Sequence, residues 1–202
     1  MKVTNGKTPN YDGLISLAKA NNGIIRTQQA IEAGFSKPYL ARAVQNDVIE
    51  KVAHGVYIGK HEYEDKLYVF QLKYSRLIFS CYTSAYLLEL TTRDVESIYA
   101  TAPRNYNTSK LLGKNIIVRE AECYGLGATE TTTMFGNKVK LHNAERTLCD
   151  FFNPKYAGDK FVQVEVLKNY LQSKEKNLTK LFDYAKQLGV LEELRKRVEV
   201  LL

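Results

Sequence analysis

A predicted helix from Ser36 to about Asp47 carries side chains suited to reading DNA bases. A step of about 100° per residue places its apolar residues on one side. Tyr39, Arg42 and Gln45 then lie on the other side or its flanks. Arg can form two hydrogen bonds to guanine, and Gln can do the same to adenine. A solvated polar helix face is the alternative, but the neighbouring segments favour contact with DNA.

The start of the same helix is suited to holding a DNA phosphate. Ser36 can cap the helix, and Pro38 fits the first turn because proline has no N–H to leave unpaired there. Ser36 and Lys37 lie at the N-terminal end, where the helix dipole favours an anion. We therefore expect this end to contact the DNA backbone.

Two further helices precede this one and position it. The pattern predicts a first helix over residues 11–21, a very short strand at Ile24-Ile25, and a second helix that Thr27 caps and that ends at Ala33. Only residues 34–36 separate the second helix from the third. A turn of three or four residues that contains Gly is typical of a helix-turn-helix.

A predicted hairpin follows the third helix directly. Residues 48–53 and 56–58 alternate and are rich in Val, Ile and Tyr, with a tight turn at His54-Gly55. A helix-turn-helix followed by a hairpin is a winged helix-turn-helix. Lys51 and His54 are the candidates for DNA contact in the wing. A neutral His substitutes poorly for Arg in a narrow groove, so an exposed His54 without a role stays equally open.

Composition and charge agree with a globular protein that binds a polyanion. Hydrophobic residues make up 45% of the 202 residues and charged residues 25%, which argues against wholesale disorder. The net charge is +7, distributed as +4 over residues 1–60, zero over 61–150 and +3 over 151–202. The basic residues of the last segment are either a second charged surface or, the preferred interpretation, a solvated lysine face.

We expect a cytoplasmic protein without metal, cofactor or disulfide. The longest uncharged run, between Arg76 and Glu89, is shorter than the ~18–20 apolar residues of a membrane span. The first thirty residues show no secretory signal pattern. The three cysteines form no CxxC pair, and no HExxH motif occurs.

The remainder of the chain predicts a second domain of mixed α+β structure that ends in helices. We therefore expect domains at residues 1–60 and 61–202, and the fold class α+β. The predicted strands are 77–79, 97–101, 115–119, 131–135 and 138–142, and the predicted helices are 63–75, 84–90, 144–152 and most of the last fifty residues. Gly136-Asn137 indicates a hairpin, and Asn143 can cap the helix that follows.

Catalytic constellations are sparse, and we expect no enzyme and no catalytic residue. A metal-dependent nuclease is the alternative, with Glu120 and Glu122 on one strand face and Lys114 nearby. Cys149 is better explained by packing in a core than as a nucleophile. Arg146 and Asp150 have i, i+4 spacing and can form an ion pair that stabilises the helix.

Four short stretches share their order and spacing with a known family. They are residues 23–30 followed by Ala33-Gly34, the wing 52–57, Thr101-Ala102-Pro103, and residues 145–151. Through them the chain resembles the AbiEi-type antitoxins of bacterial AbiE abortive-infection systems, which are type IV toxin–antitoxin pairs. The family often has Arg where this chain has His54.

The resemblance implies two activities. The winged helix would bind inverted repeats in double-stranded DNA upstream of its own operon and repress it. The larger domain would counteract a nucleotidyltransferase-like toxin in phage abortive infection, without the need for a stable complex. The alternatives are the nuclease and a winged-helix adaptor that binds protein. The residues predicted to contact DNA are Arg26, Thr27, Gln28, Ser36, Lys37, Tyr39, Arg42, Gln45, Lys51 and His54.

Overall fold

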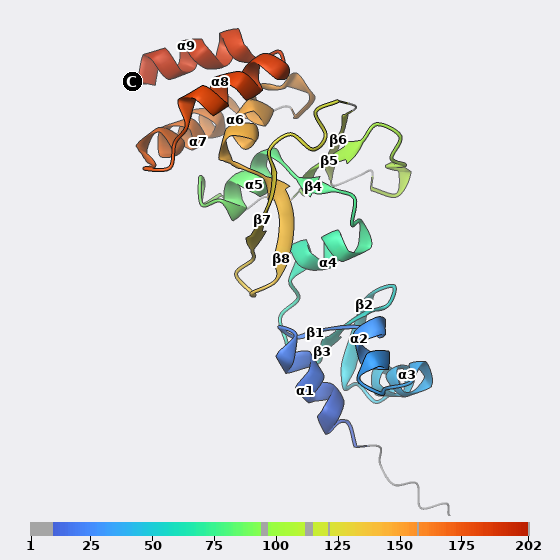
Figure 1. The fold of residues 1–202 in the computed structure, drawn as a ribbon. Helices are drawn as coiled ribbons and strands as arrows, with labels where there is room; N and C mark the ends of the chain where they lie inside the picture. The colour runs from blue at the N-terminus through green and yellow to red at the C-terminus, as the bar shows by residue number, and fades with distance from the viewer. Residues whose placement is uncertain (1–9, 94–96, 112–114, 121, 157, 202) are drawn as a thin grey trace, which may run out of the picture. The chain divides into compact units, whose positions relative to one another are not determined.

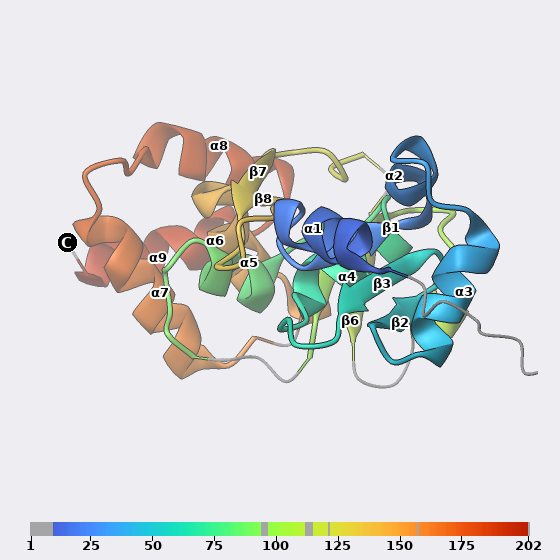
Figure 2. The same ribbon diagram turned by 90° about the horizontal axis from the view of Figure 1, so that it is seen from below.

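The computed structural model describes residues 10–93, 97–111, 115–120, 122–156 and 158–201. The chain divides into two compact units (Figures 1 and 2). The first contains residues up to Lys73 together with Met134–Asn137, and the second contains Tyr74–Thr133 and Lys138–Leu202. The fold class is α+β, as predicted, with an N-terminal winged helix, a larger mixed sheet and C-terminal helices.

The first unit begins with the three predicted helices. Helix α3 begins after Ser36, whose side chain accepts a hydrogen bond from the Tyr39 N–H at 3.3 Å, so the predicted cap is confirmed. Thr27 is the first residue of α2 rather than its cap, because the chain is still extended at Arg26. Gly34, with φ of +88°, ends the turn from α2 in a conformation that favours glycine. The bounds are α1 Asp12–Ala20, α2 Thr27–Glu32 and α3 Lys37–Gln45.

A sheet of three antiparallel strands completes the winged helix. Its order is β1-β3-β2, with β1 at Ile24–Arg26, β2 at Ile49–Ala53 and β3 at Val56–Gly59. β2 and β3 are the predicted hairpin, and Gly55 takes φ of +71° in the turn between them. Figures 1 and 2 show α2 and α3 side by side at one end of this sheet.

The apolar side chains of α1 and α3 form the core of the first unit. Leu14, Leu40 and Ala43 are fully buried, together with Ile25 from β1. The three helical residues are among those that the helical period placed inward. The first unit also contains α4, Lys66–Lys73, whose Val69 packs with residues of β1 and β3.

The second unit is built on a five-stranded mixed sheet. Its order is β6-β5-β4-β8-β7, in which the β5–β6 and β4–β8 pairs are parallel and the β4–β5 and β7–β8 pairs are antiparallel. The strands are β4 Ile78–Phe79, β5 Tyr99–Pro103, β6 Ile116–Glu120, β7 Ala128–Thr132 and β8 Lys138–His142. β7 ends three residues earlier than predicted, so five residues rather than Gly136-Asn137 alone connect it to β8.

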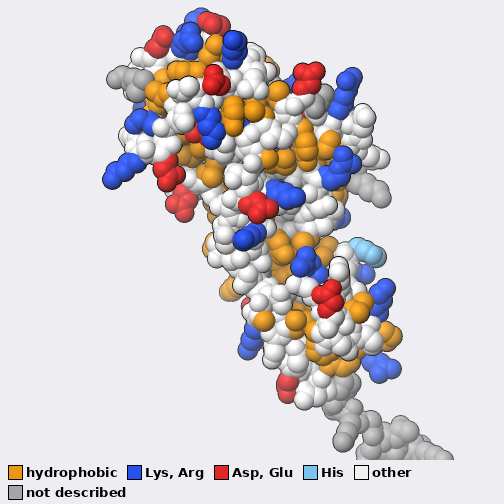
Figure 3. Space-filling view, in the orientation of Figure 1, with side chains coloured by type: hydrophobic (Ala, Val, Ile, Leu, Met, Phe, Trp, Pro, Cys, Tyr) orange, Lys and Arg blue, Asp and Glu red, His pale blue; other side chains and the backbone are white. Residues whose placement is uncertain are grey.

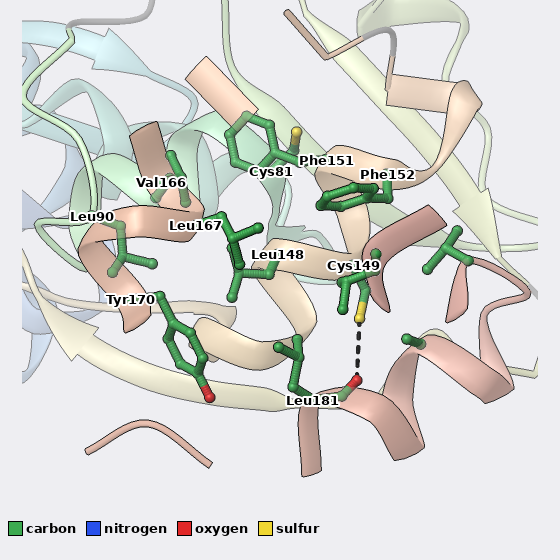
Figure 4. Close-up of a cluster of buried hydrophobic side chains, with 14 of the residues drawn as sticks. Cys81, Leu90, Leu148, Cys149, Phe151, Phe152, Val166, Leu167, Tyr170 and Leu181 are labelled. Carbon is green, nitrogen blue, oxygen red and sulfur yellow. Dashed lines mark hydrogen bonds between the residues drawn. The ribbon is translucent and has the colours of Figure 1, made fainter. Parts of the chain in front are cut away.

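Helices of the second unit pack around α6, Ala144–Phe152, which Asn143 caps as predicted. Leu148 and Cys149 of α6 are fully buried, and the Cys149 thiol points toward the Leu181 carbonyl (Figure 4). The packing prediction for Cys149 is therefore confirmed. The remaining helical segments are α5 Cys81–Leu87, η1 Ser109–Leu111, η2 Pro154–Tyr156, α7 Lys160–Gln172, α8 Leu178–Gln187 and α9 Leu191–Leu201.

Within the part of the chain that the structure describes, no helix is both long and apolar enough to span a bilayer.

Helix α5 begins earlier than the predicted residue 84. It begins at Cys81, which has φ of +44°. The strand-to-helix turn at this point depends on burial in the core, which helical periodicity does not report.

Candidate nucleic-acid interface

One face of α3 is free of the core and carries three of the residues predicted to contact DNA. Lys37, Arg42 and Gln45 are all exposed. At about 100° per residue, these three positions fall within an arc of roughly 140°. An Arg and an amide side chain thus lie on a common exposed helix face, with the cationic Lys37 at the positive end of the helix. This arrangement is the one that docking in a major groove uses.

Tyr39 lies on the packed side of α3 rather than on this face. Its ring stacks on Phe35 at 5.5 Å between centroids and contacts the ring of Tyr11 at 5.2 Å. Its hydroxyl donates a hydrogen bond to the Asn10 carbonyl. Burial raises the pKa of Tyr39, and Tyr11 and Asp12 add to the rise. Tyr39 therefore anchors α3 to the residues before α1.

The wing is fastened to the start of α2. Both the N–H and the hydroxyl of Thr27 donate to the Gly55 carbonyl, at 2.8 and 3.2 Å. Since its hydroxyl is used in this way, Thr27 holds the wing turn in place. His54 beside Gly55 is exposed at the tip.

The register separates two of the predicted cationic contacts. Arg26 pairs with Val56, and Lys51 pairs with Tyr57. Because adjacent residues of a strand point to opposite faces, Arg26 and Lys51 lie on opposite faces of the small sheet. Both side chains are exposed. Gln28 is also exposed, and its amide donates to Glu32 at 3.0 Å.

Positive charge on the surface is dispersed. On the face shown in Figure 3, Lys and Arg side chains are interspersed with Asp and Glu rather than gathered into one continuous patch. In the first unit, Lys60 forms an ion pair with Asp47 beyond the end of α3. The positive charge on this face therefore comes from individual side chains rather than from a continuous basic patch.

The acids considered for a nuclease do not share one face of a strand, as their spacing had predicted. Glu120 is the last residue of β6 and is buried, and Glu122 lies in a bend after the strand, so β6 does not carry both on one face. The Glu120 carboxylate lies 3.1 Å from Arg146 Nη2. Lys114 lies outside the described residues. Among those that are described, no group of three or more His, Cys, Asp and Glu could hold a metal ion.

A network of buried charges centres on α6, and the sequence did not reveal its depth. Arg146 and Asp150 are both fully buried, whereas their spacing predicted only an ion pair that stabilises the helix. Arg146 Nε donates to Asp150 at 2.8 Å, and Nη1 donates to the Cys123 carbonyl at 2.7 Å. His142 Nδ1 lies 2.7 Å from the other oxygen of Asp150. The only hint in the sequence was that the charged residues Arg146 and Asp150 lie on either side of the core residues Leu148 and Cys149 in the same helix.

Electrostatics of this network keep Arg146 charged. Burial by itself lowers the pKa of Arg146, but Asp150 and Glu120 together raise it above its ordinary value. Burial also raises the pKa of the Cys149 thiol, with a smaller contribution from Asp150. A thiol held protonated is a poor nucleophile, which agrees with a structural role for Cys149.

The fold of the first unit and the exposed face of α3 together define a winged helix-turn-helix protein, to which the second unit adds an α+β domain. Residues 14–58 match the family model for transcriptional regulators of the AbiEi antitoxin type. This match confirms the predicted resemblance over the helix-turn-helix and the wing. No curated protein matches the chain.

Comparison with solved structures supports the fold along nearly the whole chain. The crystal structure of the RV2827C protein from Mycobacterium tuberculosis is similar, with a TM-score of 0.59 and 12% sequence identity. The similarity covers 96% of this chain and 82% of that protein. At this identity the likeness concerns the fold alone.

Proposed function

We propose that the protein is a sequence-specific repressor of its own operon, in which α3 reads an operator in the major groove. The observation that carries the proposal is the exposed face of Lys37, Arg42 and Gln45 on the second helix of a helix-turn-helix. The family match over residues 14–58 supports a regulatory role. The DNA would be double-stranded inverted repeats upstream of the operon.

Individual residues have distinct roles in this proposal. Arg42 and Gln45 contact base edges, whereas Ser36 and Lys37 contact phosphate. Further contacts come from Arg26 in β1, Gln28 in α2, Lys51 in β2 and His54 at the wing tip. Tyr39 and Thr27 position α3 and the wing, because their hydroxyl groups already bond to the protein.

The second unit would act as the antitoxin and counteract a nucleotidyltransferase-like toxin during abortive infection. This part of the proposal rests on the predicted resemblance and on a fold that continues well beyond the winged helix. It involves no catalysis by this chain, and neither the nuclease nor the protein-binding adaptor is favoured by a specific observation. Binding of a chromosomal operator also requires a cytoplasmic location.

Gel-shift titration of the full chain tests the repressor proposal. The probe is the DNA upstream of its own gene, with excess random competitor at two salt concentrations. Arg42→Ala is expected to weaken operator binding by about 1–3 kcal/mol, and Lys37→Ala to weaken binding to all DNA and flatten the salt dependence. Lys19→Ala, an exposed change on α1, is the matched control and leaves affinity unchanged.

Unchanged operator affinity in Arg42→Ala contradicts the proposed reading by α3. A shift that competitor abolishes indicates only charge-driven binding, and the absence of any shift at low salt favours the adaptor. Co-expression with a toxin encoded beside the gene separates the two roles. Arg42→Ala should lose repression yet still protect cells, whereas loss of both would assign protection to repression alone.

A further inference from the structure

The second unit contains a pocket at the edge of its sheet where β5 and β6 end. These strands are parallel, with Ala102 opposite Arg119, so their carboxyl ends meet at the same edge. The pocket has a volume of about 340 Å³, within the range of small-molecule sites. Its lining comes from β6, η2, α8 and the loops between them, and it contains both cationic and acidic side chains.

Cationic side chains from three separate segments line this pocket. Arg104 follows β5, Arg119 belongs to β6, and Lys155 belongs to η2. All three are exposed, and within the described residues none of them forms an ion pair. Two guanidinium groups at one site favour a phosphate, because each can donate two parallel hydrogen bonds to its oxygens.

One of the two acids in the pocket is paired with the buried network. Glu120 is only 8% exposed and lies 3.1 Å from Arg146 Nη2. That Nη2 group is buried and has no hydrogen-bond partner in good geometry among the described residues. Arg146, which also pairs with Asp150, thus lies immediately behind the pocket-lining carboxylate of Glu120. Three cationic side chains against two carboxylates leave the lining with a net positive charge, and Glu122 is the exposed acid among its residues.

Neutral groups in the lining suit a ligand larger than a phosphate ion. The amides of Asn153 and Gln187 provide hydrogen-bond donors and acceptors, and half-buried Leu188 provides an apolar surface. Glu122 can accept hydrogen bonds from hydroxyl or amino groups. A nucleoside phosphate carries all of these complementary features in one molecule.

We propose that this pocket binds a small phosphate-bearing ligand of mononucleotide size through Arg104, Arg119 and Lys155. The site belongs entirely to the second unit, so the inference is independent of operator binding by the first. A free nucleotide and an inorganic polyphosphate share the phosphate chemistry, and the test separates them.

Calorimetric titration of the full chain with ATP and with inorganic pyrophosphate, without divalent ions, tests the site. ATP is expected to bind, and Arg104→Gln/Arg119→Gln to weaken it by about 10-fold or more, as expected for loss of charge-assisted hydrogen bonds. Lys168→Gln/Lys174→Gln, two exposed changes in the same unit, is the charge-matched control and keeps the affinity. Tighter binding of ATP than of pyrophosphate assigns a nucleotide, and equal binding assigns the phosphate groups alone.

Two further measurements place the ligand. Bound ATP is expected to slow modification of the Cys123 thiol several-fold, and this protection should vanish in the double arginine variant. Arg42→Ala should leave ATP binding unchanged, which distinguishes this pocket from the DNA-binding face. The proposal is overturned if neither ATP nor pyrophosphate binds, or if the double arginine variant binds ATP with unchanged affinity.

Discussion

The buried network around α6 makes a quantitative prediction for Asp150→Asn. This change preserves the shape of the side chain and removes its negative charge, so no cavity contributes to the result. Asp150 and Arg146 are fully buried, and Arg146 Nε lies 2.8 Å from Asp150 Oδ1. His142 Nδ1 lies 2.7 Å from the second carboxylate oxygen, Oδ2. Loss of one partner from a buried ion pair costs about 3–5 kcal/mol, because the remaining charge stays desolvated. We therefore expect a loss of this size in the free energy of unfolding.

Urea denaturation measures this loss. The 14 tyrosines and the absence of tryptophan make tyrosine fluorescence and far-UV circular dichroism the suitable signals. The corresponding decrease in Tm is roughly 6–20 °C for a chain of this length that unfolds as one cooperative unit. Asp183→Asn, an exposed change on α8, is the matched control and should stay within about 0.5 kcal/mol of the unmodified protein.

A double-mutant cycle with Arg146→Met decides whether the two groups act together. Charge pairing predicts that Asp150→Asn costs much less when Arg146 has already been replaced. If the two single changes add, or if Asp150→Asn alone leaves stability unchanged, the reasoning about the buried pair is wrong.

Two other predictions follow from burial and ion pairing. The native protein should react with an aromatic disulfide reagent near neutral pH at a single thiol, that of Cys123. The reason is that burial raises the pKa of the Cys81 and Cys149 thiols. Fast reaction of all three thiols before unfolding would contradict this prediction. Glu165 accepts a hydrogen bond from the Thr91 hydroxyl, and this bond together with the ion pair to Arg93 lowers the pKa of Glu165. Its contribution, at most about 1 kcal/mol for so exposed a pair, is present above the unfolded-state pKa and is lost as pH falls through the folded-state pKa. Glu165→Gln should therefore destabilise at about pH 7 and have little effect at about pH 3, and an equal effect at both would exclude this cause.

Local patterns in the first unit predicted its elements closely. The cap at Ser36, the short turn at Gly34 and the hairpin around Gly55 depend on residues only a few positions apart. For this reason, a single sequence is enough to predict α3 and its exposed face. Tyr39 is the exception on α3, because its partners Tyr11 and Asn10 come from an earlier segment.

The second unit shows the limits of the same reasoning. Arg146 and Asp150 have the spacing of an ordinary exposed ion pair, and periodicity does not report that both are buried. The structure places Glu120 and His142, from two strands, against them. Their energetic importance comes from low dielectric surroundings, which only the packed fold provides.

The sequence by itself determined the helix-turn-helix, its wing and the outward face of α3, because caps, turns and helical period act within one or two turns of chain. Tertiary structure alone decided the depth of the charge network and the meeting of Arg104, Arg119 and Lys155 around one pocket. Those groups come from segments up to some fifty residues apart in the chain. Their proximity depends on the parallel pairing of β5 and β6 and on the position of η2, which no local pattern specifies.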